Sequence, residues 1–363
     1  MFTIADYTYM AQALRLAERG LWTTDPNPRV GCVIVRDDEV VGEGWHERAG
    51  EPHAEVNALR QAGDRARAAT AYVTLEPCSH YGRTPPCAEA LLNAGVARVV
   101  AAMVDPNPKV SGRGLALLEQ AGIETAVGLL EAEARQLNPG FISRFSRGRP
   151  YVRCKLAMSL DGRTALASGE SKWITGEAAR EDVQRLRARS SVIVTGINTV
   201  LADDPRLNVR VPFECKQPDR VVLDTALRIP LDAQILQQEG QIWIATSPPD
   251  EASREALEQA GIGVIELLSE NGKLDLHGLM GQFNDLHYNE VLIEAGPTLS
   301  GAFLAAGLVD ELVVYMAPHL LGDGASGLIR LPLLEKMEQR VALALKDVRQ
   351  VGGDIRLTLL TRH

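Results

Sequence analysis

The residues of this chain best suited to chemistry are one histidine, two cysteines and one glutamate in its first third. They occur as His53-Ala54-Glu55, then Pro77-Cys78, then Cys87. One imidazole and two thiolates form a three-ligand set for Zn²⁺. The fourth tetrahedral position is then left to a water, whose pKa the metal lowers toward neutrality. Glu55 remains as a carboxylate that can carry a proton, so the pattern predicts a zinc-activated water with Glu55 as its proton shuttle.

The spacing of these residues predicts how they are held. His53 and Glu55 are two residues apart and cannot share a face in the middle of a helix, so we expect both in a first helical turn. The set is close to the H-x-E…P-C-x-x-C pattern of nucleobase deaminases, except that eight residues, 79–86, separate the cysteines. Gly and paired Pro residues in this gap indicate a fixed loop that returns Cys87 to a helix start. The competing interpretation is that both cysteines are ordinary small core residues.

Length, cysteine usage and charge limit the class of protein. With 363 residues the chain can form two domains with full cores, and no stretch approaches about 18 consecutive apolar residues. Five scattered cysteines are too few for a disulfide framework, and thiolates that serve a metal need a reducing compartment. Because the N-terminus also lacks a basic leader, we expect a cytoplasmic protein with no membrane partner.

The charge balance argues against a nucleic-acid partner. The formal net charge is −9, and residues 1–149 carry 16 basic and 18 acidic side chains, a net charge of −2. No run of Lys or Arg is interleaved with aromatic residues, as nucleic-acid binding usually requires. A diffusible small molecule is therefore the expected substrate.

Helical and strand patterns alternate along the chain and predict two α/β domains, residues 1–147 and 148–363. The first should be a three-layer domain with a mixed sheet and a hairpin around Asp37-Asp38. The boundary is expected in the Gly- and Pro-bearing stretch from Asn138 to Pro150. The expected elements are a helix containing Met10 and Ala17, helices 54–63, 87–94, 113–121, 131–137, 251–260 and 298–306, and strands 71–75, 98–104, 151–157, 191–195, 220–223, 241–245, 263–267, 290–294, 310–316 and 355–361.

A second chemical site is indicated by two glycine turns that follow apolar strands in the later part of the chain. Segment 291–301 runs from an apolar strand through Gly296 into a helix opened by Pro297, and such a helix start can bind phosphate. Segment 195–207 has a Gly turn followed by hydroxyl and carboxylate groups, as in ligand crevices of open α/β sheets. The alternative for this segment is helix capping by Asn198 or Thr199 with a turn at Asp204-Pro205.

Three basic side chains lie in the same part of the sequence. Lys155 occurs in an otherwise apolar strand, where it would contact phosphate or substrate, or simply face outward from an edge strand. Arg187 and Arg210 flank this region, and each is individually compatible with a solvated arginine.

Taken together, these segments closely resemble the bifunctional riboflavin-biosynthesis family, in which a pyrimidine deaminase is fused to a reductase. The resemblance covers the whole chain, and its long Cys-to-Cys loop is a feature of that family. It is carried by Asn27-Pro28-Arg29-Val30-Gly31-Cys32-Val33, His53-Ala54-Glu55, 74–87, Lys155-Leu156-Ala157-Met158-Ser159-Leu160-Asp161-Gly162, Ser168-Gly169-Glu170-Ser171, Asp203-Asp204-Pro205 and Glu294-Ala295-Gly296-Pro297-Thr298.

The resemblance implies two consecutive reactions. The first domain, cytidine-deaminase-like in fold, would remove the C2 amino group of 2,5-diamino-6-ribosylamino-4(3H)-pyrimidinone 5′-phosphate. The second, similar to dihydrofolate reductase, would reduce the ribosyl group of the product to ribityl with NADPH. A homodimer through the reductase domain is also implied.

The resemblance further implies the site residues. One zinc ion per chain would be bound by His53, Cys78 and Cys87, with Glu55 as proton shuttle. Substrate contacts would be Asn27, His46, His80 and Arg83 in the first site, and Lys155, Ser171, Arg187, Leu207, Arg210 and Glu294 in the second. NADPH would be bound by Ala157, Trp173, Thr199, Asp203, Thr225, Gly296, Pro297, Thr298, Leu299, Ser300, Gly301 and Ala302.

Two other interpretations keep the metal but change its role. A nucleic-acid-editing or nucleoside deaminase with a C-terminal binding or dimerisation module would show no nicotinamide oxidation. A structural zinc would need a closed four-ligand site, and the sequence offers no obvious fourth ligand.

Overall fold

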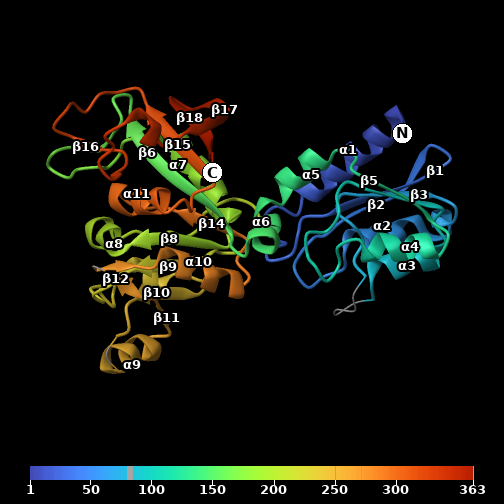
Figure 1. The fold of residues 1–363 in the computed structure, drawn as a ribbon, viewed down its shortest axis with the longest axis horizontal. Helices are drawn as coiled ribbons and strands as arrows, with labels where there is room; N and C mark the ends of the chain where they lie inside the picture. The colour runs from blue at the N-terminus through green and yellow to red at the C-terminus, as the bar shows by residue number, and fades with distance from the viewer. Residues whose placement is uncertain (80–84, 250, 271, 363) are drawn as a thin grey trace. The chain divides into compact units, whose positions relative to one another are not determined.

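The computed structural model describes residues 1–79, 85–249, 251–270 and 272–362 (Figure 1). The chain divides into two compact units, Met1–Gly148 and Arg149–His363. The division predicted from the sequence was 1–147 and 148–363. Each unit has a sheet and a hydrophobic core of its own.

Unit 1 contains a five-stranded mixed sheet with the strand order β2-β1-β3-β4-β5. Strand β1 is antiparallel to both of its neighbours, β2 and β3, whereas β3, β4 and β5 are parallel. The helices and strands of this unit are α1 (Ile4–Glu18), β1 (Gly31–Arg36), β2 (Glu39–Trp45), α2 (Ala54–Ala62), the 3₁₀ turn η1 (Gly63–Ala66), β3 (Thr70–Val73), α3 (Cys87–Ala94), β4 (Arg98–Ala101), α4 (Arg113–Gln120), β5 (Glu124–Val127), α5 (Glu131–Leu137) and α6 (Pro139–Arg147).

The hairpin of β1 and β2 turns where the sequence predicts. Asp37 and Asp38 both have positive φ, 51° and 60°, which is the conformation of a tight type I′ hairpin turn. Helix α2 approaches this hairpin very closely, since a Cβ on Gly44 would lie 2.4 Å from the carbonyl oxygen of Ala54. The contact fixes the start of α2 on the sheet.

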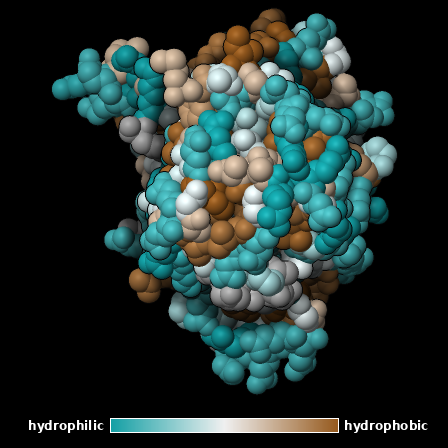
Figure 2. All heavy atoms as spheres, turned by 90° about the vertical axis from the view of Figure 1, so that its right-hand side faces the viewer, coloured by the Kyte–Doolittle hydropathy of each residue, from teal (hydrophilic) through white to brown (hydrophobic). Residues whose placement is uncertain are grey.

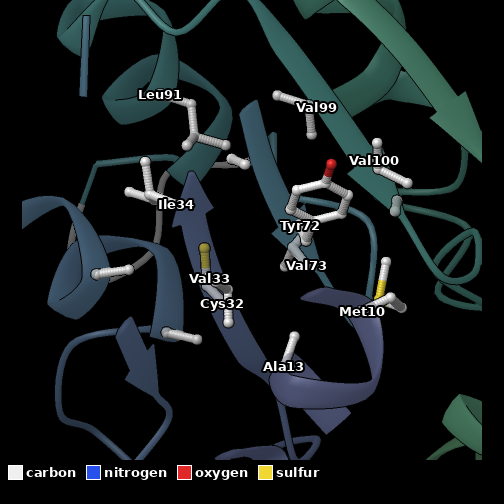
Figure 3. Packing of buried hydrophobic residues seen from close by; sticks show 14 of the residues in the cluster. Met10, Ala13, Cys32, Val33, Ile34, Tyr72, Val73, Leu91, Val99 and Val100 are labelled. Atoms are coloured by element: carbon white, nitrogen blue, oxygen red, sulfur yellow. The ribbon is translucent and has the colours of Figure 1, made fainter. Parts of the chain in front are cut away.

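The core of unit 1 lies on both sides of the central strands and includes side chains from α1, α2 and α3. Strand β1 is buried along nearly its whole length, which fits a strand covered on both faces. Figure 3 shows the side chains that pack together here: Met10, Ala13, Cys32, Val33, Ile34, Tyr72, Val73, Leu91, Val99 and Val100.

Unit 2 contains a nine-stranded sheet with the order β11-β10-β9-β8-β14-β6-β15-β18-β17. The strands from β11 to β15 are parallel, and β18 and β17 complete the sheet as an antiparallel pair. The elements of this unit are β6 (Tyr151–Ser159), β7 (Arg163–Ala165), α7 (Glu177–Ala188), β8 (Val192–Gly196), α8 (Ile197–Asp203), β9 (Asp219–Leu223), η2 (Gln234–Gln237), β10 (Ile242–Thr246), α9 (Glu251–Gln259), β11 (Gly263–Glu266), β12 (Ser269–Glu270), β13 (Lys273–Leu274), α10 (Leu276–Asp285), β14 (Glu290–Ile293), α11 (Pro297–Ala305), β15 (Glu311–Ala317), β16 (Ser326–Gly327), η3 (Met337–Gln339), β17 (Leu343–Val351) and β18 (Asp354–Thr361).

Strand β6 lies inside this sheet, between β14 and β15. The interpretation of Lys155 as an outward residue of an edge strand is therefore wrong. The carboxyl ends of β6, β8, β9 and β14 meet at one edge of the sheet, as parallel strands require, and ligands of open α/β sheets bind at such an edge.

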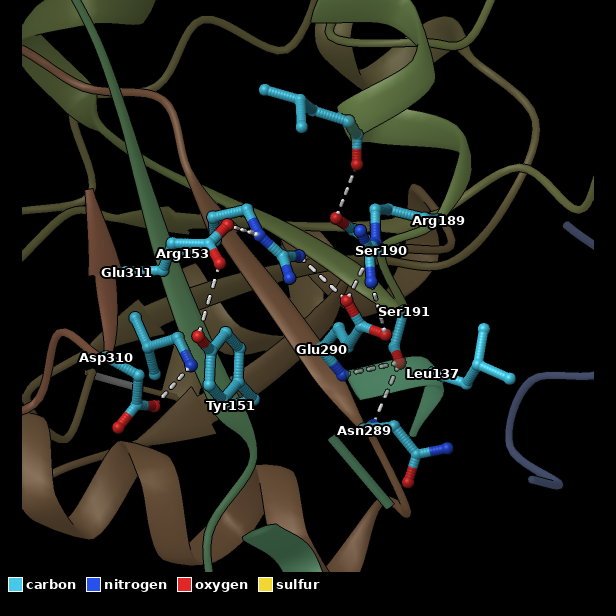
Figure 4. A network of polar contacts seen from close by, with 12 residues as sticks. Leu137, Tyr151, Arg153, Arg189, Ser190, Ser191, Asn289, Glu290, Asp310 and Glu311 are labelled. Atoms are coloured by element: carbon cyan, nitrogen blue, oxygen red, sulfur yellow. Dashed lines mark hydrogen bonds and ion pairs between the residues drawn. The ribbon is translucent and has the colours of Figure 1, made fainter. Parts of the chain in front are cut away.

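At the other edge of this sheet, a buried ionic network joins the amino ends of strands β6, β14 and β15 (Figure 4). The guanidinium of Arg153 on β6 donates to Glu290 at 2.7 Å and to Glu311 at 2.5 Å. Arg189 adds a contact of 3.0 Å to Glu290, and Lys346 one of 3.1 Å to Glu311. The network fixes the start of β6 against β14 and β15, and thus the register of the residues that follow in β6.

Several elements differ from the sequence-based expectation. The stretch predicted as a domain boundary contains helix α6, because Phe141 is buried and Ile142 and Phe145 pack against the core of unit 1. Pro139 is compatible with this helix because it occupies the first turn, where its missing N–H is not needed. Helices α7, α8 and α10 and strand β17 were not predicted.

No helix within the described residues is long and apolar enough to cross a membrane. Figure 2 shows one face of the molecule, on which hydrophilic and apolar residues are interspersed.

Candidate active sites

Three side chains of unit 1 converge from the starts of two helices and the loop between them. His53 is the N-cap residue of α2, so it precedes the first helical turn in which it was predicted. Cys78 lies in the loop after β3, and Cys87 is the first residue of α3. Within the part of the chain that the structure describes, they are the one group of His, Cys, Asp or Glu placed to share a metal ion.

The distances in this group fit Zn²⁺. His53 Nδ1 lies 3.2 Å from Cys87 Sγ and 3.6 Å from Cys78 Sγ, and all three ligand atoms lie within 4.8 Å of one another. Tetrahedral Zn²⁺ with its usual bonds to nitrogen and sulfur places such atoms about 3.6 Å apart. One imidazole and two thiolates also match the preference of zinc for nitrogen and sulfur ligands.

The ionisation of the two cysteines is coupled through their contact. Hydrogen bonds from the Cys87 thiol and the His53 ring hold the pKa of Cys78 well below its usual range, although burial opposes this. The same contact, together with burial, raises the pKa of Cys87. Cys78 is therefore the thiol that ionises first, and a divalent cation would favour the thiolate form of both.

Glu55 lies in the first turn of α2 and is 3% exposed. Burial raises the pKa of its carboxyl group to about 7, and this outweighs the opposing effect of His53. A cation bound by the neighbouring ligands would counteract the rise. The carboxyl group is thus buried beside the metal ligands, where it can exchange a proton with groups bound there.

Asn27 and His46 lie beside the metal-ligating group. The His46 ring is edge-on to the ring of His53, with centroids 5.3 Å apart. His46 Nδ1 is 3.1 Å from the carbonyl oxygen of Pro52, which can only accept, so this nitrogen carries the hydrogen. His46 Nε2 then accepts from Asn27 Nδ2 at 3.0 Å. Burial lowers the pKa of His46, which favours this neutral form.

The other two residues predicted for this site, His80 and Arg83, lie outside the described residues. Asp105 is a buried carboxyl group close to the site that the sequence analysis did not single out. Burial raises its pKa to about 6, with smaller contributions from Glu76 and Cys78. Its position at the end of the segment that follows β4, before Pro106-Asn107-Pro108, was the signal that could have identified it.

In unit 2, Arg187 and Glu294 form a two-point ion pair at the sheet edge. Arg187 Nε and Nη2 lie 2.6 and 3.0 Å from the two carboxylate oxygens of Glu294. Arg187 Nη1 also donates to the carbonyl oxygen of Asn208 at 3.1 Å. Burial alone would raise the pKa of Glu294, but Arg187 and Lys155 lower it, so Glu294 is ionised.

Lys155 completes this cluster from β6. Burial lowers the pKa of its ammonium group, Glu294 opposes the change, and Arg187 adds to it. Residues 155, 187 and 294, which come from β6, α7 and the end of β14, are thus brought together. The mixed charge of the cluster would orient a polar substrate.

The segment after α8 adds further positive charge. Leu207 is buried, whereas Arg210 is exposed and donates to the side chain of Asn208. Burial lowers the pKa of Arg210, and the neighbouring positive charges of Arg187 and Arg206 lower it further. The mutual repulsion of these guanidinium groups would be relieved by a bound anion.

The turn into α11 is formed as the sequence predicts, with a glycine before a helix that begins with proline. Gly296 is the N-cap residue of α11 and Pro297 occupies the first turn. The backbone at Gly296 does not require glycine, since φ is −69° and a Cβ would meet nothing within 4 Å. A side chain at position 296 would therefore enter space that the protein leaves open, where it could crowd a bound ligand. A Cβ on Gly196, the N-cap residue of α8, would lie 3.4 Å from the side chain of Leu299 in α11. The first turns of α8 and α11 are therefore neighbours.

Gly301 has a packing role in the fold. A Cβ at this position would lie 1.9 Å from the carbonyl oxygen of Arg330, so glycine is needed for contact with that segment. The remaining residues of the predicted turn, Thr298, Ser300 and Ala302, belong to α11.

The other predicted cofactor residues, together with Ser171 from the predicted substrate site, come from four different segments. Ala157 lies on β6, and Thr199 and Asp203 lie in α8. Helix α8 has no side-chain cap, and Asn198 accepts from Arg228 at 3.0 Å, so the capping alternative for this segment is wrong. Thr225 follows β9, and its carbonyl oxygen accepts from two hydroxyl groups. Two further residues, Ser171 and Trp173, precede α7, with Trp173 largely exposed beneath the guanidinium of Arg180.

Comparisons with known proteins identify both units. A family model described as the cytidine and deoxycytidylate deaminase zinc-binding region matches residues 4–103, and the RibD C-terminal domain matches residues 150–357. Riboflavin biosynthesis protein RibD of Escherichia coli (strain K12) is 55% identical over 98% of this chain and 99% of its own length. The chain belongs to the RibD family.

Solved structures of RibD proteins agree with this assignment. RibD of Acinetobacter baumannii is 50% identical, with a TM-score of 0.93 over 99% of both chains. A Thermotoga maritima protein, described as a diaminohydroxyphosphoribosylaminopyrimidine deaminase/5-amino-6-(5-phosphoribosylamino)uracil reductase, is 29% identical, with a TM-score of 0.86 over 99% of both chains.

Membership of the RibD family decides between the interpretations left open by the sequence. This chain is a bifunctional deaminase and reductase of riboflavin biosynthesis that uses Zn²⁺ and NADPH. It has an N-terminal cytidine-deaminase-like domain and a C-terminal reductase domain, as predicted. A single-activity deaminase is not favoured.

Proposed function

We propose that unit 1 deaminates 2,5-diamino-6-ribosylamino-4(3H)-pyrimidinone 5′-phosphate at C2, and that unit 2 then reduces the ribosyl group of the product to ribityl. The family assignment and the description of the Thermotoga maritima protein support this substrate pair. The net charge of −9 argues against a nucleic-acid substrate, and the mixed-charge cluster of unit 2 suits a small polar one.

His53, Cys78 and Cys87 would hold the zinc ion of unit 1, one per chain. The two nitrogen-to-sulfur distances, 3.2 and 3.6 Å, support this ligand set. When bound there, zinc lowers the pKa of a coordinated water toward neutrality and so supplies the nucleophile.

Glu55 carries the proton in the deamination. This role rests on one observation: Glu55 is buried in the first turn of α2, two residues after His53. The carboxylate accepts a proton from the attacking water and delivers it to the departing amino nitrogen. Glu55 can play both roles because a single carboxyl group beside the metal ligands can accept this proton and return it.

Asn27 and His46 recognise the pyrimidine beside the metal ligands. Because His46 Nε2 accepts from Asn27 Nδ2, the Asn27 amide is held in one orientation. His46 is in turn fixed by Pro52 through Nδ1. We assign His80 and Arg83 to the substrate phosphate on family resemblance alone.

In unit 2 the pyrophosphate of NADPH would bind at the N-terminus of α11, whose first backbone N–H groups lack helical partners. Bound NADPH supplies a hydride to the ribosyl carbon. The assignment of Ala157, Trp173, Thr199, Asp203 and Thr225 to this cofactor continues to rest on resemblance.

The charged cluster of unit 2 would position the second substrate. Glu294 is ionised and held by Arg187, so it can accept a hydrogen bond from a sugar hydroxyl, and Lys155 can donate one. Since Arg187 is engaged within the chain, we assign the phosphate to the exposed Arg210. Ser171 and Leu207 would complete the pocket.

We further propose that the protein is a homodimer that acts in the cytoplasm. Support for the dimer comes from the antiparallel pair at the end of the unit 2 sheet, where Leu345, Val348 and Ile355 expose large apolar side chains. Support for the reducing compartment comes from five free cysteines, two of which would ligate the metal.

The substitution Glu55→Gln tests whether the two reactions take place at separate sites in the two units. The amide preserves size but cannot carry the proton, so ammonia release should fall by at least about a hundredfold while zinc content stays parental. Supplied with the deaminated ribosylaminouracil phosphate, the variant should still oxidise NADPH at close to the parental rate. Loss of both activities would contradict separate sites, and loss of neither would remove Glu55 from the mechanism.

A further inference from the structure

The side chain of Glu76, two residues before Cys78, has no role in the chemistry described above. It is 3% exposed, and its two oxygens accept four backbone N–H groups. Oε2 accepts from Asp105 at 3.1 Å and from Gly112 at 2.9 Å. Oε1 accepts from Gly114 at 2.9 Å and from Leu115 at 3.4 Å. Backbone donors thus compensate for the burial of this carboxylate.

Three of these four donors lie at the start of α4. Gly112 is the N-cap residue of this helix, and it has no side chain that could accept a hydrogen bond. Gly114 and Leu115 are the second and third helical residues, whose N–H groups lack a partner within the helix. Glu76 therefore caps α4 from a distant part of the chain, with its negative charge at the positive helix end.

Helix α4 also contacts the backbone that leads into Cys78. A Cβ on Gly114 would lie 1.9 Å from the carbonyl oxygen of Pro77, so the first helical turn touches the residue before the ligand. On the α3 side, the carbonyl oxygen of Cys78 accepts from Ala88 at 3.2 Å, and its Sγ accepts from the Cys87 N–H at 3.3 Å. Cys78 is thus held between the starts of two helices.

From these contacts we infer that Glu76 is a positioning residue for the metal-ligating thiolate of Cys78. The inference rests on the proposed function in one respect, the assignment of Cys78 as a ligand. By tying α4 to residues 76–78, Glu76 restricts Cys78 Sγ to the position 3.6 Å from His53 Nδ1. Outer-shell partners of metal ligands are typically worth about 10- to 100-fold in metal affinity.

The substitution Glu76→Gln tests this role in the full-length protein. The amide has the same shape, but it replaces one acceptor oxygen by an NH₂ group that faces backbone donors. Competition with a chromophoric chelator measures zinc affinity, and the thiolate-to-cobalt absorption of the Co²⁺-substituted protein reports the geometry of the ligating thiolates. We expect zinc binding to weaken by at least about tenfold and the cobalt absorption to change. Glu119→Gln, an exposed change on the same helix, should leave both parental.

Parental zinc affinity together with a parental cobalt spectrum in Glu76→Gln would overturn the inference. If that variant does not accumulate as folded protein, Gly114→Ala decides by the same two measurements, because it keeps the Glu76 carboxyl group but pushes the start of α4 away from Pro77 and from Glu76. Parental values in Gly114→Ala would then overturn it. Absence of zinc from the parent itself would instead refute the ligand assignment, and the inference with it.

Discussion

Replacement of Arg153 by methionine should strongly destabilise unit 2, because it leaves two carboxylates buried without their main cationic partner. The side chains of Arg153, Glu290 and Glu311 are at most 5% exposed. Burial raises the pKa of Glu311, but Arg153 and then Lys346 outweigh it, so the pKa falls from 4.5 to about 2. A change of this size corresponds to about 3 kcal/mol. Breaking a buried pair by removing one partner typically costs about 3–5 kcal/mol, and we expect a loss in this range.

The loss of stability in Arg153→Met should depend on pH in a defined direction. In the parent, the pKa of Glu311 is lower in the folded than in the unfolded chain, so its stabilisation is present above pH 4.5 and lost as the pH falls toward 2. Without Arg153, the largest of the charges that lower the pKa of Glu311 is gone and mainly Lys346 still opposes burial, so the pKa of Glu311 in the folded variant rises above its parental value. The difference in unfolding free energy between parent and variant should therefore shrink as the pH falls through this raised pKa, because protonation of Glu311 then relieves the variant before it affects the parent.

Guanidinium titrations read by hydrogen exchange of peptides from β6 and β14 would measure this difference in unit 2 alone. Arg349→Met is the matched control, because Arg349 pairs with Asp347 at 2.7 Å on the surface of the same sheet. It should cost less than about 1 kcal/mol. A loss below about 1 kcal/mol in Arg153→Met, or one that does not change with pH, would refute the electrostatic explanation of this network.

Four further substitutions address the two sites. Cys78→Ser and Cys87→Ser should each remove most of the single zinc equivalent by metal analysis, and full retention in both would contradict the ligand set. Arg210→Ala should raise the KM of the reductase for its phosphorylated substrate by about tenfold or more with little change in kcat, since it removes uniform binding; an unchanged KM would place the phosphate elsewhere. Gly296→Val should weaken NADPH binding in calorimetry without loss of stability, because its Cβ meets only space that a ligand would fill; unchanged affinity would exclude the pyrophosphate from this turn.

The chemistry of the first site could be predicted from the sequence because its signal is local. His53 and Glu55 are two residues apart, and Cys78 and Cys87 are separated by one short loop. Helix and strand periods likewise act over a few residues, so α3 and α5 were predicted with the bounds that they have. The hairpin at Asp37-Asp38 was predicted for the same reason, since a two-residue turn carries its own conformational preference.

Other features depend on residues that are distant in the sequence, and only the tertiary structure decided them. The stretch predicted as a domain boundary is helical because Phe141 packs into the core of unit 1. The free energy gained by this tertiary packing cannot be read from local helix propensity. Lys155 and Glu294 lie side by side only because β6 and β14 pair in parallel, and Arg187 joins them from helix α7. In the same way, Glu76 caps a helix that begins 37 residues later in the chain. The sequence by itself therefore determined which groups carry the chemistry. Packing, which joins residues far apart in the chain, determined their partners and hence their charge and position.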